Sequence, residues 1–254
     1  MHGVLDKKGE ALLAKILLAY ESIFQKDHLD VGCISGVTHK IDTGDAQPIK
    51  ALFRRTPLKM ADEERQTLKD MLQAGIVKPS ISPWSSPPVL VRKKDGTLRF
   101  VVDYRRLNAI TVKNSYPIPA LSDCLDYLQG NQVFSKLDAA SGFWMIPMEE
   151  EDAPKTAFQT RYGLFEFTRM PFGLTNAPAS FSAAVHAIFE DILYKLVVCY
   201  LDDIIIPSID TISHFLALQI AFFRLQEKGA KLKPIKCLFF QRKIDPLNLV
   251  CKIC

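Results

Sequence analysis

The sequence lacks any run of apolar residues that approaches the length of a membrane-spanning helix, so we expect no membrane partner. It contains no internal repeat and no low-complexity tract, which argues against a repeat protein and against a disordered chain. No signal-peptide pattern accompanies its six cysteines. Free thiols in a reducing compartment are therefore expected, with the cytoplasm as the default location.

A zinc site and a strong charge of one sign are also missing. Cys251 and Cys254 have no second ligand pair at zinc spacing, so they are interpreted as two unrelated thiols. The net charge of +4 is too small by itself to indicate nucleic acid. Between Arg92 and Lys113, however, there are seven basic and two acidic residues, and this segment alone carries +5. The basic charge is thus concentrated in one place.

What the chain does have is length and apolar content. With 254 residues, 48% of them hydrophobic, it can bury a sizeable core as one large domain or two subdomains.

The stretch Leu196–Ile206 predicts two short apolar strands with Asp202 and Asp203 between them. Adjacent carboxylates disfavour each other's ionisation, and a tight hairpin favours Asn-Gly or Asp-Gly at its turn. A nearby positive charge, most simply a divalent metal ion, explains such a pair. The alternative is a solvated turn, which is the favoured interpretation if the pair is considered alone.

A second hairpin is predicted from Val89 to Asp103, around an Asp95-Gly96 turn. Lys93, Lys94 and Arg99 would flank that turn. Three cations at one tip indicate a phosphate-binding patch, and the alternative is a solvated hairpin tip.

Periodicity and turn residues predict the remaining elements. Helices are expected over residues 9–24, 61–74, 120–129, 178–194 and 212–228. Strands are expected at Val37–Asp42, Val133–Leu137, Trp144–Met148 and Lys231–Phe240, with a hairpin around Arg161–Gly163. Asp138 ends one of these strands and is followed by small residues, where backbone N–H groups can approach an anion. A cap or turn role is the alternative for Asp138.

Five ordered motifs then resemble one family. Tyr200-Leu201-Asp202-Asp203 matches the Tyr-X-Asp-Asp motif of reverse transcriptases. The other blocks are Ser86–Asn108, Leu137-Asp138 with Phe143, Met170–Pro178, and Gly229–Cys237. The Phe172 variant and the Lys236-Cys237 ending resemble the Pol polyprotein of gypsy-type LTR retrotransposons. The resemblance runs from about His39 to Gln241.

The resemblance implies an α+β fold: a right-hand polymerase palm, with an antiparallel sheet backed by helices, and a fingers subdomain. It places a helix and linker at 1–60, fingers at 61–132 and 150–172, and palm at 133–149 and 173–245. Residues 246–254 depart from the family pattern. We therefore expect a chain truncated after the palm, without the thumb, RNase H and integrase parts of the polyprotein.

The resemblance also implies a site. Asp138, Asp202 and Asp203 would hold two Mg²⁺ ions, with Mn²⁺ as an alternative ion. Among the implied substrate-binding residues, Lys93 and Arg99 would bind the triphosphate, and Ala140, Ser141 and Gly142 would line it. Phe143 would act as a gate against a ribose 2′-hydroxyl, and Phe172 and Gly173 would border the nucleotide and template. Lys236 would protonate the leaving group. Ordinary core packing is the alternative for Phe143 and Phe172.

Two functions follow from the resemblance. The first is an RNA-directed DNA polymerase that adds deoxynucleotides to a primer paired with an RNA or DNA template, in the cytoplasm or in retroelement particles. The second is a truncated remnant that at most binds nucleic acid through its basic fingers. An unrelated α/β domain with a metal-free Asp-Asp turn is a remote third hypothesis.

Overall fold

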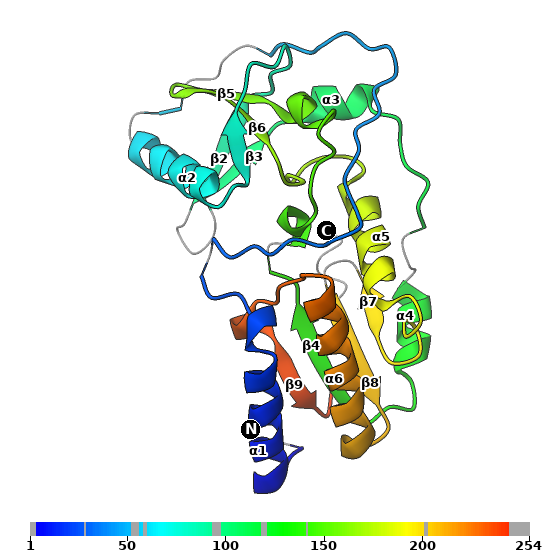
Figure 1. The fold of residues 1–254 in the computed structure, drawn as a ribbon. Coiled ribbons are helices and arrows are strands. Elements are labelled where there is room, and N and C mark those ends of the chain that lie inside the picture. Colours follow the sequence, from blue (N-terminus) through cyan, green and yellow to red (C-terminus); the bar gives the residue numbers. More distant parts are fainter. Residues whose placement is uncertain are drawn as a thin grey trace. The chain divides into compact units, whose positions relative to one another are not determined.

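The structure is a computed structural model that describes residues 4–27, 29–51, 56–57, 60–92, 98–117, 121–140, 142–200 and 203–243, without the side chains at 98, 99 and 121. It divides into two compact units (Figure 1). Unit 1 comprises Met1–Gly36, Pro117–Gly142 and Phe181–Cys254, and unit 2 comprises Val37–Tyr116 and Phe143–Ser180. Within the described ranges, no helix is long and apolar enough to cross a bilayer. The fingers and palm boundaries predicted above stay a prediction.

Unit 1 is built on a four-stranded antiparallel sheet in the order β7-β8-β4-β9. Its strands are β4 (Val133–Asp138), β7 (Val198–Tyr200), β8 (Asp203–Ser208) and β9 (Leu238–Gln241). Its helices are α1 (Lys7–Ala19), η1 (Glu21–Ile23), α4 (Leu121–Leu128), α6 (Thr211–Glu227) and η5 (Pro234–Lys236). All six residues of β8 are buried, among them the apolar run Ile204–Ile206, which predicts a buried strand.

Helices cover both faces of this sheet. On one face, His214 of α6 lies 2.7 Å from Ser135 Oγ in β4 and 2.9 Å from Ser208 Oγ in β8. On the other face, Cys124 of α4 packs in a cluster with Ile205. Because side chains alternate along a strand, Ser135 and Ile205 mark opposite faces of the sheet. Figure 1 shows α6 running lengthwise beside β4 and β8 of unit 1.

Unit 2 contains a three-stranded sheet, β1-β6-β5, and the two-stranded hairpin β2-β3. Its elements are α2 (Ala61–Gln73), β1 (Val77–Pro79), β2 (Pro88–Arg92), β3 (Leu98–Val102), α3 (Arg105–Ile110), η4 (Ala153–Thr156), β5 (Phe158–Thr160) and β6 (Gly163–Phe167). Its core centres on Phe158, whose ring contacts those of Phe100, Phe165 and Phe167. Two further elements carry residues of both units: η3 (Gly142–Met145) and α5 (Ala177–Phe189).

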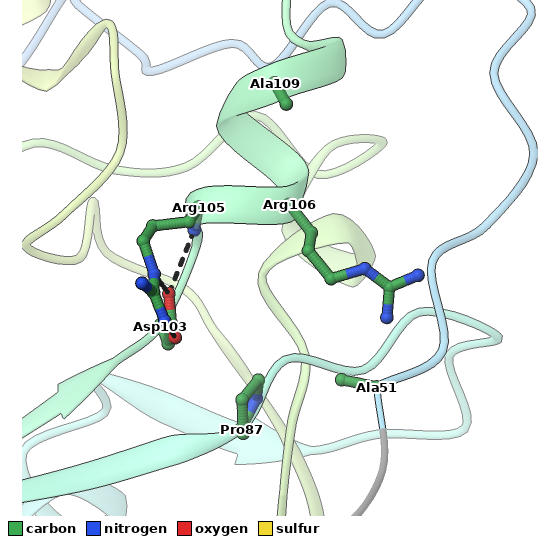
Figure 2. Close-up of a pocket in the computed structure, with 6 residues that line it drawn as sticks. All are labelled: Ala51, Pro87, Asp103, Arg105, Arg106 and Ala109. Atoms are coloured by element: carbon green, nitrogen blue, oxygen red, sulfur yellow. Dashed lines mark hydrogen bonds and ion pairs between the residues drawn. The ribbon is translucent and has the colours of Figure 1, made fainter.

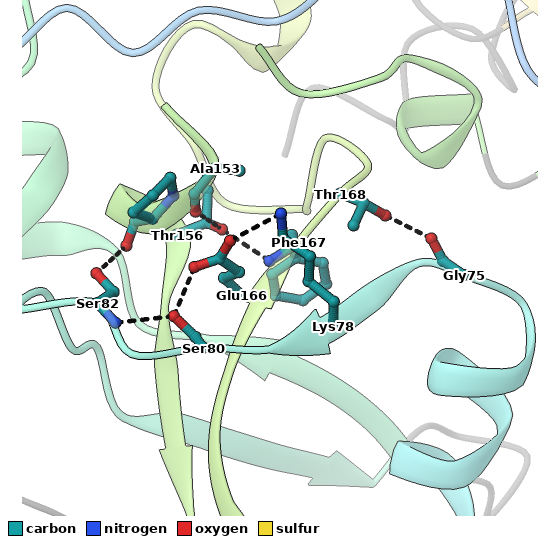
Figure 3. A network of polar contacts seen from close by, with 10 residues as sticks. Gly75, Lys78, Ser80, Ser82, Ala153, Thr156, Glu166, Phe167 and Thr168 are labelled. Atoms are coloured by element: carbon teal, nitrogen blue, oxygen red, sulfur yellow. Dashed lines mark hydrogen bonds and ion pairs between the residues drawn. The ribbon is translucent and has the colours of Figure 1, made fainter. Parts of the chain in front are cut away.

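A network of polar contacts ties β1 to β6 (Figure 3). The buried Glu166 carboxylate accepts a hydrogen bond from Ser80 Oγ and lies 3.2 Å from Lys78 Nζ. Next to it, the Phe167 amide donates to Thr156 Oγ1 at 2.9 Å, and Thr168 Oγ1 donates to the Gly75 carbonyl. A buried carboxylate needs such partners, so Glu166 fixes the register of this sheet.

Most of the predicted elements are confirmed. The hairpin expected over Val89–Asp103 is β2-β3, and that expected around Arg161–Gly163 is β5-β6. Helices α1, α2, α4 and α6 occupy the predicted stretches within a few residues. Gly75, Gly130 and Gly229 follow three of these helices with φ of 64°, 78° and 73°, the left-handed conformation in which glycine ends a helix.

Two of the predicted strands are wrong. Over Val37–Asp42 the chain forms only a single bridge, between His39 and Met148. The ladder does not continue because the next available amide, that of Ile41, donates to the Asp152 carboxylate at 2.8 Å. Over Trp144–Met148 the chain starts as the 3-10 helix η3 and then makes isolated bridges.

Two other elements are shorter than predicted. The Lys231–Phe240 strand begins only at Leu238, because Pro234 has no N–H for a ladder and instead starts η5. The helix expected to reach residue 194 ends at Phe189. The chain beyond it turns through Tyr194 at φ 57°, a conformation that is foreign to a right-handed helix.

His214 makes stability depend on pH. Burial lowers its pKa from the ordinary 6.5 to about 4, so the folded chain holds it neutral. The unfolded chain takes up the proton at higher pH. The contribution of His214 to the free energy of unfolding is therefore fully present above pH 6.5. It is lost as pH falls toward 4, by about 1.4 kcal/mol per pH unit. Between about pH 7 and about pH 5, we expect the melting temperature of His214→Gln to fall less than that of the wild type.

The buried His39, whose pKa is also lowered to about 4 by burial, offers the matched variant His39→Gln. The double variant should show the flattest dependence of melting temperature on pH. Unchanged dependence in both single variants would contradict this assignment.

Candidate functional site

Two buried carboxylates face each other in the sheet of unit 1. Asp138 is the last residue of β4 and Asp203 is the first residue of β8. The antiparallel register places them directly opposite one another, a position in which Cα atoms are about 4.5–5.5 Å apart. Their exposed fractions are only 8% and 1%. Residues 65 positions apart in the sequence are thus brought together by strand pairing.

The Asp-Asp hairpin is confirmed in its strands. β7 and β8 pair antiparallel, with Tyr200 opposite Asp203. Leu201 and Asp202 lie outside the described residues. The structure therefore brings together two of the three predicted carboxylates, and the third directly precedes Asp203 in the sequence.

Each of the two carboxylates has a lysine beside it. Lys136 Nζ lies 2.9 Å from Asp203 Oδ2, and Lys236 Nζ lies 3.2 Å from Asp138 Oδ2. The segment that carries Lys236 is held against the end of β4, because the Lys233 amide donates to the Asp138 carbonyl at 2.9 Å. Positive charge thus balances both acids, as close burial of like charges requires.

Lys136 was not among the residues predicted for the site. The signal that could have identified it is strand alternation: Lys136 stands two residues before Asp138, so both side chains lie on the same face of β4. A cation two positions before a candidate metal ligand on the same strand is within reach of whatever that ligand binds.

The donor chemistry of this pair fits a hard divalent cation. Asp138 and Asp203 offer only oxygen, which Mg²⁺ and Mn²⁺ prefer. Among the described residues no three His, Cys, Asp or Glu side chains gather closely enough to hold a metal. Asp202 falls outside that part of the chain. The pair would therefore supply part of a ligand set.

The predicted triphosphate-binding residues are only partly described. Ala140 is fully buried, and its amide already donates to the Lys231 carbonyl at 2.9 Å. Gly142 begins η3, where an added Cβ would meet the Phe181 ring at 3.2 Å. Arg99 lies in β3 opposite Val91, without a described side chain, and Lys93 and Ser141 lie outside the described residues.

The predicted nucleotide-pocket residues cluster in unit 2. The Phe143 and Phe172 ring centroids are 5.3 Å apart, and 39% of Phe172 is exposed. Gly173, at φ 94°, accepts a hydrogen bond from Asn108 Nδ2 at 2.8 Å. Asn108 Oδ1 in turn accepts from the Thr175 amide at 2.9 Å. Asn108 thus holds the loop that presents Phe172, a role that the sequence analysis did not assign to it.

Unit 2 also contains a basic pocket of about 340 Å³ (Figure 2). It is lined by Ala51, Pro87, Asp103, Arg105, Arg106 and Ala109. Arg105 is held by Asp103 through contacts of 2.8 and 2.6 Å, which raise the pKa of its guanidinium. Arg106 extends instead toward Ala51 and has no ion-pair partner among the described residues. One guanidinium in this pocket is therefore available to an anion.

Comparisons with known proteins agree with this geometry. The family model described as "Reverse transcriptase (RNA-dependent DNA polymerase)" matches residues 91–249. The Pol polyprotein from transposon 297 of Drosophila melanogaster is 36% identical over 252 residues, covering 96% of this chain and 24% of the relative. That from transposon gypsy of the same fly is 31% identical over 222 residues, covering 85% and 21%. This chain thus spans about a quarter of the length of these curated relatives.

A solved structure is similar as well. The foamy viral protease-reverse transcriptase in complex with RNA/DNA hybrid superposes with a TM-score of 0.86 and 26% identity, over 93% of this chain and 32% of that one. The α+β architecture predicted from the motifs, with its antiparallel sheet backed by helices, is confirmed by this likeness.

Proposed function

The chain belongs to the reverse transcriptase (RNA-dependent DNA polymerase) family, and from this premise we propose that it adds deoxynucleotides to the 3′-hydroxyl of a primer paired with an RNA or DNA template. The observation that carries the proposal is the placement of Asp138 opposite Asp203, both buried and both at strand ends. The similar foamy viral protein is solved with an RNA/DNA hybrid, which supports a primer-template as the partner.

In the proposed mechanism Asp138 and Asp203, together with Asp202, would hold two Mg²⁺ ions. When bound, such ions supply charge stabilisation to the attacking hydroxyl and to the leaving pyrophosphate. The part of the protein is to fix the carboxylates, and the β4–β8 ladder does so through paired backbone on both strands. Preorganised ligands need no rearrangement at the moment of reaction.

The remaining predicted residues take supporting roles in the proposal. Lys236, which lies beside Asp138 with 56% of its side chain exposed, would give a proton to the leaving group. Lys93 and Arg99 would bind the triphosphate, which Ala140, Ser141 and Gly142 would line. Phe143, supported by Phe172, would exclude a ribose 2′-hydroxyl, and Gly173 would border the pocket.

A second candidate function is nucleic-acid binding without chemistry. The basic pocket around Arg106 favours it, because an unpaired guanidinium recognises a phosphate whether or not a nucleotide is added. Both functions can belong to one chain, and the experiments below separate them.

Asp138→Asn should lower kcat for Mg²⁺-dependent primer extension on an RNA template by at least about 100-fold, because the proposed ions lose a carboxylate ligand and with it the charge stabilisation that they would supply. The fold should persist by circular dichroism. Asp126→Asn, an exposed change on α4, is the control and should retain full activity. A wild-type chain that binds a primer-template but never extends it would reduce the proposal to the binding function.

Phe143→Ala should relax discrimination between deoxynucleotides and ribonucleotides, measured as the ratio of their kcat/KM values. Phe172→Leu removes the supporting ring and should have a smaller effect in the same direction. If Phe143→Ala lowers the melting temperature but leaves the ratio unchanged, Phe143 is an ordinary packing residue.

Binding of a primer-template should weaken linearly with the logarithm of salt concentration, since each phosphate contact releases counterions. Arg106→Ala should weaken binding and reduce the salt slope by about 1. Arg65→Ala removes the same charge from an exposed position on α2, outside the pocket. Equal effects of the two substitutions would show diffuse electrostatic attraction in place of a phosphate site.

A further inference from the structure

We propose that Lys136 is a positioning residue whose ammonium takes the place of a cation beside Asp203 in the metal-free protein and competes with a divalent ion for that carboxylate. The inference rests on the metal role proposed above for Asp203. Its basis is the close contact between Lys136 Nζ and Asp203 Oδ2, 2.9 Å apart, in a site where the two side chains are only 15% and 1% exposed.

Strand geometry explains why this lysine reaches that acid. Lys136 pairs with Ile205, and Asp203 stands two residues before Ile205 on β8. Lys136 and Asp203 are therefore diagonal neighbours on one face of the sheet, about 7–8 Å apart at their Cα atoms, which a long side chain spans. The same face carries Asp138 at the end of β4. Lys136, Asp138 and Asp203 thus lie on one face of the sheet, which is also the face on which the two carboxylates would share an ion.

The backbone of Lys136 cannot move aside. β4 is an inner strand of the sheet, and Lys136 has Ile205 of β8 on one side and Leu238 of β9 on the other. Only rotation of the side chain can withdraw the ammonium. A cation fixed in this way cancels repulsion between Asp203 and Asp138 when no metal is bound, and raises the concentration of metal needed to replace it.

Lys236 provides the contrast within the same site. It pairs with Asp138 from the short helix η5 and is 56% exposed, so water screens it and its side chain can swing away. Lys136 is the more buried of the two lysines. The competition is therefore assigned to Lys136.

The test is metal binding by the full chain, followed through the electron paramagnetic resonance signal of free Mn²⁺. Lys136→Met keeps an unbranched side chain and removes the charge. It should lower the melting temperature in chelator, because Asp203 loses its counter-charge. It should also tighten Mn²⁺ binding about 10-fold, since the competing cation is gone. Added Mn²⁺ should then raise the melting temperature more in this variant than in the wild type.

Two further variants isolate the charge. Lys136→Arg retains a cation and should restore both the wild-type melting temperature in chelator and the wild-type Mn²⁺ affinity. Lys78→Met breaks a different lysine–carboxylate pair, with the buried Glu166 in unit 2, in which the lysine is 52% exposed. It should lower the melting temperature while leaving Mn²⁺ affinity unchanged.

The outcomes are distinguishable. Unchanged or weaker Mn²⁺ binding by Lys136→Met, with wild-type binding that depends on Asp138, overturns the competition and leaves the proposed function intact. No Mn²⁺ binding by the wild type overturns both. If Lys136→Met does not fold, Lys136→Met with Asp203→Asn removes both charges, and its recovery of the fold supports the counter-charge role. A double variant that also fails to fold contradicts it.

Discussion

The constraint on which the structure depends is the mutual repulsion of two carboxylates that are buried opposite each other, because this repulsion has to be offset. Strand pairing brings Asp138 and Asp203 together, and burial prevents water from screening them. Such an arrangement persists only if positive charge is supplied nearby. Lys136 and Lys236 supply it, one to each acid. The same need for positive charge makes the pair a suitable place for divalent ions.

The rest of unit 1 keeps the two strand ends in register. β8 is buried between β7 and β4, and α6 is fastened across β4 and β8 by His214, which contacts Ser135 and Ser208 together. A slip of one residue would turn Asp203 to the opposite face and break both serine contacts. The buried histidine, held neutral by its environment, thus helps to define the geometry of acids that lie on the other face of the sheet.

Sequence patterns predicted the elements whose signals are local. The apolar run of β8, the hairpin β2-β3 and the glycine-terminated helices follow from periodicity and turn chemistry. The errors arose where a side chain or a proline redirected the backbone, as Asp152 does at Ile41 and Pro234 does before β9. For the site, motifs predicted Asp138 and Asp203, which strand pairing places opposite each other, but the Lys136–Asp203 contact depends on register between strands far apart in the sequence. Asn108 was missed for the same reason, because its bonds to Gly173 and Thr175 join distant segments.

The two lysines of the site differ in a way that suits different tasks. Lys136 is fixed in an inner strand and largely buried, so its charge acts continuously on Asp203. Lys236 follows a proline-initiated turn and is more than half exposed, so it can approach or leave Asp138 without disturbing the sheet. A residue that balances a resting charge needs the first setting, and the proton transfer proposed for Lys236 would need the second. The sheet and the turn that meet at Asp138 provide one of each.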